Sequence, residues 1–204
     1  MTVNDIIETE NLNLSVISLN LESKRITSLE GIEKFSDLQH LELGGNSIEK
    51  ISALPTSLRY LYLQQNKISS LKDASFLENL IVLDLTYNRL ENLEGIENFK
   101  NLTSLYLAGN SLKSLNGIEH LKNLRMLSVT DNKLDSIEEI LSLDSLQTIW
   151  FGGNKFADKY GDSSKADTLK VQLYRELHLR PNDDLRGAAS IMDTGLFDFI
   201  SVPS

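Results

Sequence analysis

The sequence predicts an α/β repeat protein. The expected fold is a right-handed solenoid with a curved parallel sheet on its concave side, short 3₁₀ or irregular helical returns on its convex side, and a helical C-terminal cap. Two observations predict it: asparagines recur at intervals of 20, 22, 22, 22 and 22 residues, and each closes a phrase of regularly spaced leucines. The six asparagines are Asn46, Asn66, Asn88, Asn110, Asn132 and Asn154.

The phrase is clear in the unit that reads Leu80-x-x-Leu83-x-Leu85-x-x-Asn88-x-Leu90. This spacing is the signature of a leucine-rich repeat, so the predicted fold is a leucine-rich-repeat solenoid. Leu83 and Leu85 alternate with polar residues, which indicates a strand. We expect the amide of Asn88 to bond to the backbone of its turn and of the next coil, because those groups would otherwise be buried without partners.

Seven strand-bearing units follow one another along the chain. They open at Val16, Leu38, Leu58, Leu80, Leu102, Leu124 and Leu146. After each strand, apolar residues recur at three-residue spacing, which suits a 3₁₀-like return on the convex side. The first unit has Lys24 at the asparagine position, a departure expected of a terminal repeat. The second unit is two residues short, so we expect a tight turn at Pro55 there.

The ends of a solenoid need covers, because a bare last strand exposes apolar core and an unpaired edge. We expect residues 1–15 to form the N-terminal cap and residues 16–156 to hold the seven repeats. Residues 157–187 are predicted to form the C-terminal cap. The whole of residues 1–187 would then be one leucine-rich-repeat domain.

Within the C-terminal cap, residues 157–168 are polar and predicted to be a loop. Leucines at four-residue spacing then predict an amphipathic helix over residues 169–177, which Pro181 ends. The tail, residues 188–204, is too apolar for a plain disordered segment. We expect the tail to pack on its own domain, and docking on a partner is the alternative.

The composition limits the classes of partner and the cellular locations that we expect. The 204-residue chain has a net charge of −9, which argues against a nucleic-acid backbone as the main partner, because phosphate binding needs a basic face. The chain has no cysteine, no visible signal peptide and no apolar run of membrane-spanning length. These features favour a cytoplasmic protein, with a nuclear or cytoskeleton-associated location open. We expect it to be monomeric by itself, with no membrane contact.

The chain resembles the SDS22-like class of cytosolic leucine-rich repeat proteins. That class includes the phosphatase-1 regulatory subunit SDS22, dynein light chain 1 and the U2 snRNP protein A′. The features that carry the resemblance are the 22-residue period, the phrase Leu-x-Gly-Ile-Glu at residues 29–33, 93–97 and 115–119, and the segment Tyr174-Arg175-Glu176-Leu177-x-Leu179-x-Pro181. The resemblance covers residues 16–187. It implies a non-enzymatic, partner-binding role.

Two positions depart from the pattern of that class. The cap of the class begins with Asn-Pro, whereas this chain has Asn154-Lys155. The class closes its cap with Leu-Asp-Gly, whereas this chain has Leu185-Arg186-Gly187.

If the leucines of each strand point inward, the residues between them face the concave side. These residues are Ser18, Asn20 and Glu22; His40, Glu42 and Gly44; Tyr60, Tyr62 and Gln64; Val82, Asp84 and Thr86; Ser104, Tyr106 and Ala108; Met126, Ser128 and Thr130; Thr148, Trp150 and Gly152. None is Lys or Arg, three are carboxylates and four are large aromatic residues. The concave face is therefore predicted to be acidic and aromatic.

From this set we predict a partner-binding site. It consists of Glu42, Tyr60, Tyr62, Asp84, Tyr106, Met126 and Trp150. Tyr62 and Tyr106 should lie two strand spacings apart, roughly 10 Å, with Asp84 between them. Rings can bury large areas and a carboxylate can pair with a cation, so we expect a basic, partly apolar segment or helix of another protein to dock here. The alternative is that Tyr and Thr are simply good strand residues.

Other functions have weaker support in the sequence. His40, His120 and His178 are scattered, and no nucleophile–base pair or metal-ligand spacing unites them, so we predict no enzyme activity, metal or cofactor. The three concave carboxylates could hold a cation loosely, although a solvated acidic face explains them as well. A ribonucleoprotein component of the U2 A′ type, acting through a protein partner, stays open. So does an exposed virulence-type repeat protein of a bacterium, which the missing signal peptide weakens.

Overall fold

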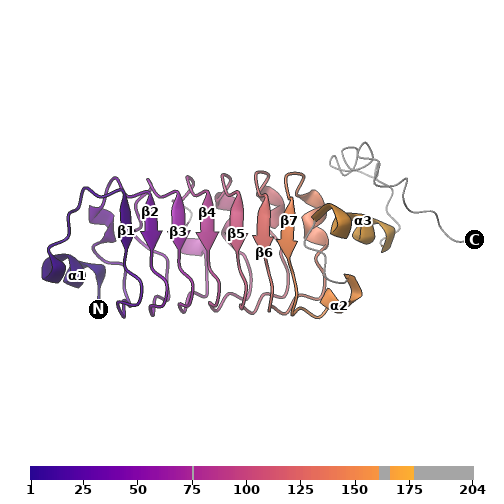
Figure 1. The fold of residues 1–204 in the computed structure, drawn as a ribbon, viewed down its shortest axis with the longest axis horizontal. Helices are drawn as coiled ribbons and strands as arrows, with labels where there is room; N and C mark the ends of the chain where they lie inside the picture. Colours follow the sequence, from indigo (N-terminus) through magenta and orange to yellow (C-terminus); the bar gives the residue numbers. More distant parts are fainter. Residues whose placement is uncertain (75, 161–165, 177–204) are drawn as a thin grey trace, which may run out of the picture.

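The computed structural model describes residues 1–74, 76–160 and 166–176. Seven strands form one parallel sheet in which each strand pairs with the next in the chain (Figure 1). The strands are β1 Ser18–Asn20, β2 His40–Glu42, β3 Tyr60–Tyr62, β4 Val82–Asp84, β5 Ser104–Tyr106, β6 Met126–Ser128 and β7 Thr148–Trp150. The predicted leucine-rich-repeat solenoid, with one strand in each unit, is confirmed.

Short 3₁₀ helices cross the convex side behind the sheet (Figure 1). Those of the described residues are η1 Ile32–Lys34, η2 Lys72–Ala74, η3 Ile96–Asn98, η4 Ile118–His120 and η5 Glu138–Ser142. They confirm the 3₁₀ returns expected from the three-residue apolar spacing. Between β2 and β3 the chain makes a turn instead, in which the Leu58 N–H donates to the Pro55 carbonyl at 3.2 Å. The tight turn expected of the shorter unit is therefore present.

The core lies between the sheet and the returns. The central leucines of neighbouring strands are in register, as Leu41 and Leu61 are, and both are fully buried. Each such side chain contributes on the order of 1.5–3 kcal/mol of burial free energy. Leu19 of β1 is only partly buried, because it has a neighbouring strand on one side alone.

The ladder asparagines are buried and hold the coils together. The Asn46 side-chain amide donates to the Leu43 carbonyl of its own coil at 2.8 Å and to the Leu21 carbonyl at 2.9 Å. Its oxygen accepts the Ile26 N–H at 2.9 Å. Leu21 and Ile26 belong to the preceding coil, so the expectation that the amide bonds to the next coil is wrong. Lys24 has only the N-terminal cap before it, and its ammonium pairs with Glu10 at 2.7 Å.

The N-terminal end of the solenoid is covered by α1, Val3–Glu10 (Figure 1). A capping box starts this helix: the Asp5 N–H donates to the Thr2 hydroxyl at 3.1 Å, and the Thr2 N–H donates to the Asp5 carboxylate at 2.7 Å. Val3 and Ile6 are buried against the core. An N-terminal cover was expected, but its helical form was not predicted.

At the other end lie α2, Ala157–Tyr160, and α3, Ala166–Glu176. The prediction of a loop over residues 157–168 is wrong at both of its ends, because α2 begins directly after the buried Phe156 and α3 begins three residues before Leu169. The ring of Phe156 stacks on Phe151 at 5.6 Å and holds this turn on the core. The Ala166 N–H donates to the Gln147 carbonyl at 3.1 Å and so fixes the start of α3.

Helix α3 covers the last repeat. Leu169 and Leu173 are buried in the core, and the buried Lys170 ammonium donates to the Leu143 carbonyl at 2.5 Å. The predictions made for residues 177–187 and for the tail, 188–204, lie outside the described residues.

Candidate functional site

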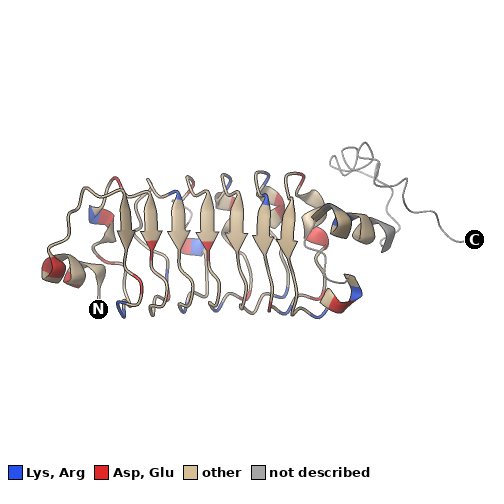
Figure 2. Ribbon diagram, in the orientation of Figure 1, with Lys and Arg blue, Asp and Glu red and all other residues tan. Residues whose placement is uncertain are grey.

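The strand register builds two straight columns of outward side chains on the concave side of the sheet, here called the strand face. The first column is Ser18, His40, Tyr60, Val82, Ser104, Met126 and Thr148. The second column is Asn20, Glu42, Tyr62, Asp84, Tyr106, Ser128 and Trp150. Figure 2 shows the strands almost without charge, except for acidic residues at the ends of β2 and β4.

All the predicted site residues lie on this face, but the register divides them into two groups. Glu42, Tyr62, Asp84 and Tyr106 are consecutive in the second column, on β2 to β5, and Tyr60 lies beside Tyr62 on β3. These five residues form the first group. The second group lies nearer the C-terminal end, with Met126 on β6 and Trp150, 40% exposed, on β7.

The first group is close enough to interact electrostatically. Partial burial raises the pKa of the Tyr62 hydroxyl above its ordinary value of 10.0, and nearby Tyr106, Glu42, Asp84 and Tyr60 raise this pKa further. The Tyr62 side chain is therefore neutral at physiological pH. It can offer an aromatic ring and a hydroxyl, but no charge, to a ligand.

His40 belongs to this cluster, although it is not among the seven predicted site residues. Its ring centroid lies 5.7 Å from that of Tyr60 and 5.3 Å from that of Tyr62. Its Nε2 lies 3.1 Å from the Glu42 carboxylate. The signal that could have found it is the register itself, because His40 precedes Glu42 by two residues and is paired with Tyr60.

The carboxylates of the strand face are held by neighbouring polar groups. Asn20 donates its side-chain amide to Glu42, and the Thr86 N–H donates to Asp84 at 2.8 Å. Gln64 reaches across Gly44 to donate to Glu22 at 2.9 Å. A Cβ on Gly44 would lie 2.5 Å from the Gln64 amide nitrogen, so this bridge needs glycine between its ends.

The described residues contain no candidate metal site and no candidate membrane-spanning helix. No cluster of three or more His, Cys, Asp or Glu side chains in residues 1–74, 76–160 and 166–176 is placed to hold a metal ion. No helix in the same part of the chain has the length and apolar character needed to cross a membrane.

Comparison with protein families identifies the repeats. Residues 56–112 match the model of a leucine rich repeat, and residues 100–142 match the model of leucine rich repeats in two copies. No curated protein matches the chain.

Solved structures of bacterial repeat proteins resemble the chain. An internalin (inlF) from Listeria monocytogenes is 28% identical with a TM-score of 0.60, over 64% of this chain and 39% of that one. A leucine-rich-repeat protein of Leptospira interrogans is 29% identical with a TM-score of 0.57, over 69% of this chain and 35% of that one. The chain thus spans well under half the length of either relative.

A third structure shows the likeness of fold alone. The functional domain of InlJ from Listeria monocytogenes, which includes a cysteine ladder, is 22% identical with a TM-score of 0.60, over 68% of this chain and 30% of that one. Our chain has no cysteine, and its ladder is made of asparagine. None of these comparisons separates the SDS22-like class from other leucine-rich repeat proteins, so that finer assignment stays a prediction.

Proposed function

We propose that this leucine-rich repeat protein is a non-enzymatic interaction module or regulatory subunit. Its strand face would bind a basic, partly apolar segment of a partner protein. The observation that carries the proposal is the unbroken run Glu42, Tyr62, Asp84 and Tyr106 across four neighbouring strands.

The spacing of this run suits a cationic side chain. Tyr62 and Tyr106 are separated by one strand, which puts their backbones roughly 10 Å apart. Asp84 lies between them, and its hydrogen bond from Thr86 fixes the position of the carboxylate. A lysine or arginine entering between the rings would gain an ion pair together with cation–π contacts worth about 0.5–1 kcal/mol each at an exposed site. The rings would bury the apolar part of the same segment.

The charge of the surface supports the same ligand. The outward residues of the seven strands include no Lys or Arg, while Glu42 and Asp84 end two of them. An acidic face on a chain of net charge −9 attracts basic partners and repels acidic ones, which raises the association rate and improves specificity. A ribonucleoprotein component of the U2 A′ type would need a protein partner for the same reason, because this face offers no cation to phosphates.

The regulatory role and the cytoplasmic location are further parts of the proposal. The cysteine-free composition supports a reducing compartment. A fixed solenoid that binds without catalysis suits a subunit that recruits or positions another protein.

A peptide selection tests the proposal. A displayed library of random peptides is selected on the wild-type protein, and the enriched peptides are measured by calorimetry against Tyr62→Ala, Tyr106→Ala and Trp150→Ala. We expect the peptides to combine Lys or Arg with large apolar residues, and each substitution in the first group to weaken binding about tenfold.

The matched control is Tyr87→Ala. Tyr87 is 56% exposed and lies in the loop after β4, outside the strand face. This variant should bind the peptides as the wild type does. If all three strand-face variants fold and also bind as the wild type does, the strand face is not the binding site.

A further inference from the structure

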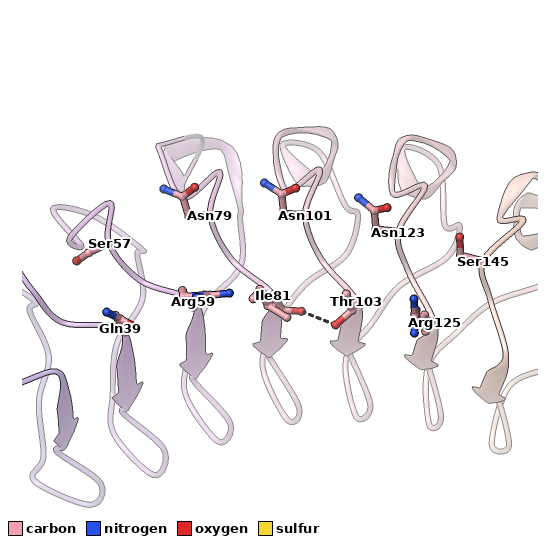
Figure 3. A pocket seen from close by; sticks show the side chains of 10 residues that line it. All are labelled: Gln39, Ser57, Arg59, Asn79, Ile81, Asn101, Thr103, Asn123, Arg125 and Ser145. Atoms are coloured by element: carbon pink, nitrogen blue, oxygen red, sulfur yellow. Dashed lines mark hydrogen bonds between the residues drawn. The ribbon is translucent and has the colours of Figure 1, made fainter.

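A second surface lies where the strands begin. A groove of about 570 Å³ runs along the N-terminal ends of β2 to β6 (Figure 3). Its floor is made by the residue that directly precedes each of these strands. These residues are Gln39, Arg59, Ile81, Thr103 and Arg125.

A second ladder forms the wall of this groove. Its members are Ser57, Asn79, Asn101, Asn123 and Ser145, which stand above the floor residues in Figure 3. Each donates one hydrogen bond to a backbone carbonyl about one unit earlier in the chain, at distances from 2.7 to 3.0 Å. The wall is therefore fixed in position. Among the residues that the structure describes, the amide oxygen and the second N–H of each of its three asparagines have no partner, so they are available to a ligand.

The two arginines of the floor are available for binding. Both are exposed, and within residues 1–74, 76–160 and 166–176 neither guanidinium has a hydrogen-bond or ion-pair partner. The Arg59 side chain extends along the floor towards Ile81 (Figure 3). None of the described residues that line the groove is a carboxylate, although the whole chain has 29 acidic and 20 basic residues.

Charges just outside the wall are mixed. Lys100 and Lys122 directly precede Asn101 and Asn123, in the half of the groove that holds Arg125. Glu78 and Asp144 directly precede Asn79 and Ser145, the wall residues on either side. The net positive charge is therefore concentrated between β5 and β6, with Arg59 as a second cation at a distance.

We propose that this groove binds an extended, acidic segment of a partner protein that carries two carboxylates four residues apart. Arg59 and Arg125 precede β3 and β6, so three strand spacings, about 14 Å, separate their backbones. An extended chain rises about 3.4 Å per residue, so carboxylates at positions i and i+4 match this backbone separation. The exposed Arg59 side chain, without a hydrogen-bond or ion-pair partner in the described residues, is free to turn from Ile81 to meet one of them. A guanidinium can hold each carboxylate through paired hydrogen bonds.

The asparagine wall favours a peptide over other anions. The exposed amide oxygens of Asn79, Asn101 and Asn123 can accept hydrogen bonds from the backbone N–H groups of an extended peptide in place of water. The phosphate groups of a nucleic-acid backbone carry no N–H, so they could satisfy the arginines but not these oxygens. The groove is thus a binding surface separate from the strand face.

Fluorescence anisotropy with defined peptides tests whether the groove binds such an acidic segment. The probe is a labelled Gly/Ser peptide with two Glu residues four positions apart. The comparison peptides have the Glu residues two positions apart, or both replaced by Gln. The first peptide should bind best, its binding should weaken as salt is added, and Arg59→Gln and Arg125→Gln should each weaken it about fivefold to tenfold.

The matched control is Arg89→Gln, because Arg89 is exposed but lies outside the groove. The Arg variants remove no side-chain hydrogen bond or ion pair within the described residues, so all of them should keep the wild-type unfolding temperature. The proposal is overturned if Arg89→Gln weakens binding as much as Arg59→Gln, or if the Gln peptide binds as well as the Glu peptide. It is also overturned if a single-stranded RNA binds more tightly through the same arginines.

Discussion

At the scale of single residues, the ladder asparagines show what a repeated motif can and cannot predict. Their spacing predicted burial and backbone bonding, because a polar residue fixed inside an apolar phrase must have a partner there. The spacing alone does not determine whether the backbone partners lie in the preceding coil or in the following one. Asn88 accepts the N–H of Ile68 and donates to the Leu63 carbonyl, both at 2.9 Å and both in the coil before it.

Replacing Asn88 with alanine should therefore destabilise the fold. The change leaves the buried Ile68 N–H without its acceptor, while the Leu63 and Leu85 carbonyls keep the amides of Asn66 and Asn110. We therefore expect a loss of about 1–3 kcal/mol in the free energy of unfolding. Urea denaturation measures it. Asn101→Ala is the control, because Asn101 is exposed and, within the described residues, its side chain makes one hydrogen bond, to the Glu78 carbonyl. Equal losses in the two variants would contradict this role for the first ladder.

The phrase Leu-x-Gly-Ile-Glu also has a residue-level explanation. Gly95 has φ +99°, and a Cβ there would lie 2.7 Å from the Leu71 carbonyl oxygen of the preceding unit. Ile96 is buried, and the Glu97 carboxylate accepts the Gly95 N–H at 3.0 Å. Glycine thus fits the close approach of two coils, isoleucine fills the core, and glutamate accepts a backbone N–H at the start of the 3₁₀ helix.

Gly95→Ala should cost about 1–3 kcal/mol, because the left-handed backbone and the close carbonyl both disfavour a side chain. Gly152→Ala is the control, since Gly152 lacks a positive φ and a Cβ there would have nothing within 4 Å. This control should be nearly neutral. Thermal unfolding of both variants checks the difference, and a Gly95→Ala protein as stable as Gly152→Ala would refute it.

At the scale of elements, repetition decided what the sequence could predict. The strands and 3₁₀ returns were predictable because each pattern recurs along the chain. Helices α1 and α2 were not predicted, because each is short and occurs once, at an end of the solenoid. Helix α3 also occurs once, but leucines at four-residue spacing predicted it. His40 was not predicted to belong to the site for a related reason. Its contacts with Tyr60 and Tyr62 join neighbouring strands, and they are not evident when each strand is considered alone.

The capping box of α1 gives a prediction on pH. The Thr2 backbone N–H, and after it the Thr2 hydroxyl, lower the pKa of the Asp5 carboxyl below its ordinary value of 3.8. A lowered folded-state pKa contributes stability above the unfolded-state pKa, and this stability is lost as the pH falls through the folded-state value. The stability gap between the wild type and Asp5→Asn should thus shrink below pH 3.8. Denaturation at a series of pH values measures the gap, and a constant gap would rule out the capping role.

At the scale of the whole molecule, one repeat register produces two bands of different chemistry. The strand face carries aromatic rings and carboxylates, and the groove at the strand starts carries Arg59 and Arg125 (Figure 3). The first band was predictable because its positions alternate with the inward leucines. The second was not, because arginine precedes only β3 and β6, and the intervening wall forms only when the units stack.

The central claim is that a cation of the partner pairs with Asp84 between two tyrosines. A double-mutant cycle tests it most directly: calorimetry compares the wild type and Asp84→Asn, each with a selected peptide and with the same peptide carrying norleucine in place of its lysine. The account predicts that the two changes are coupled by about 1 kcal/mol or more, because each removes the same ion pair. Effects that add to within about 0.3–0.5 kcal/mol would contradict it.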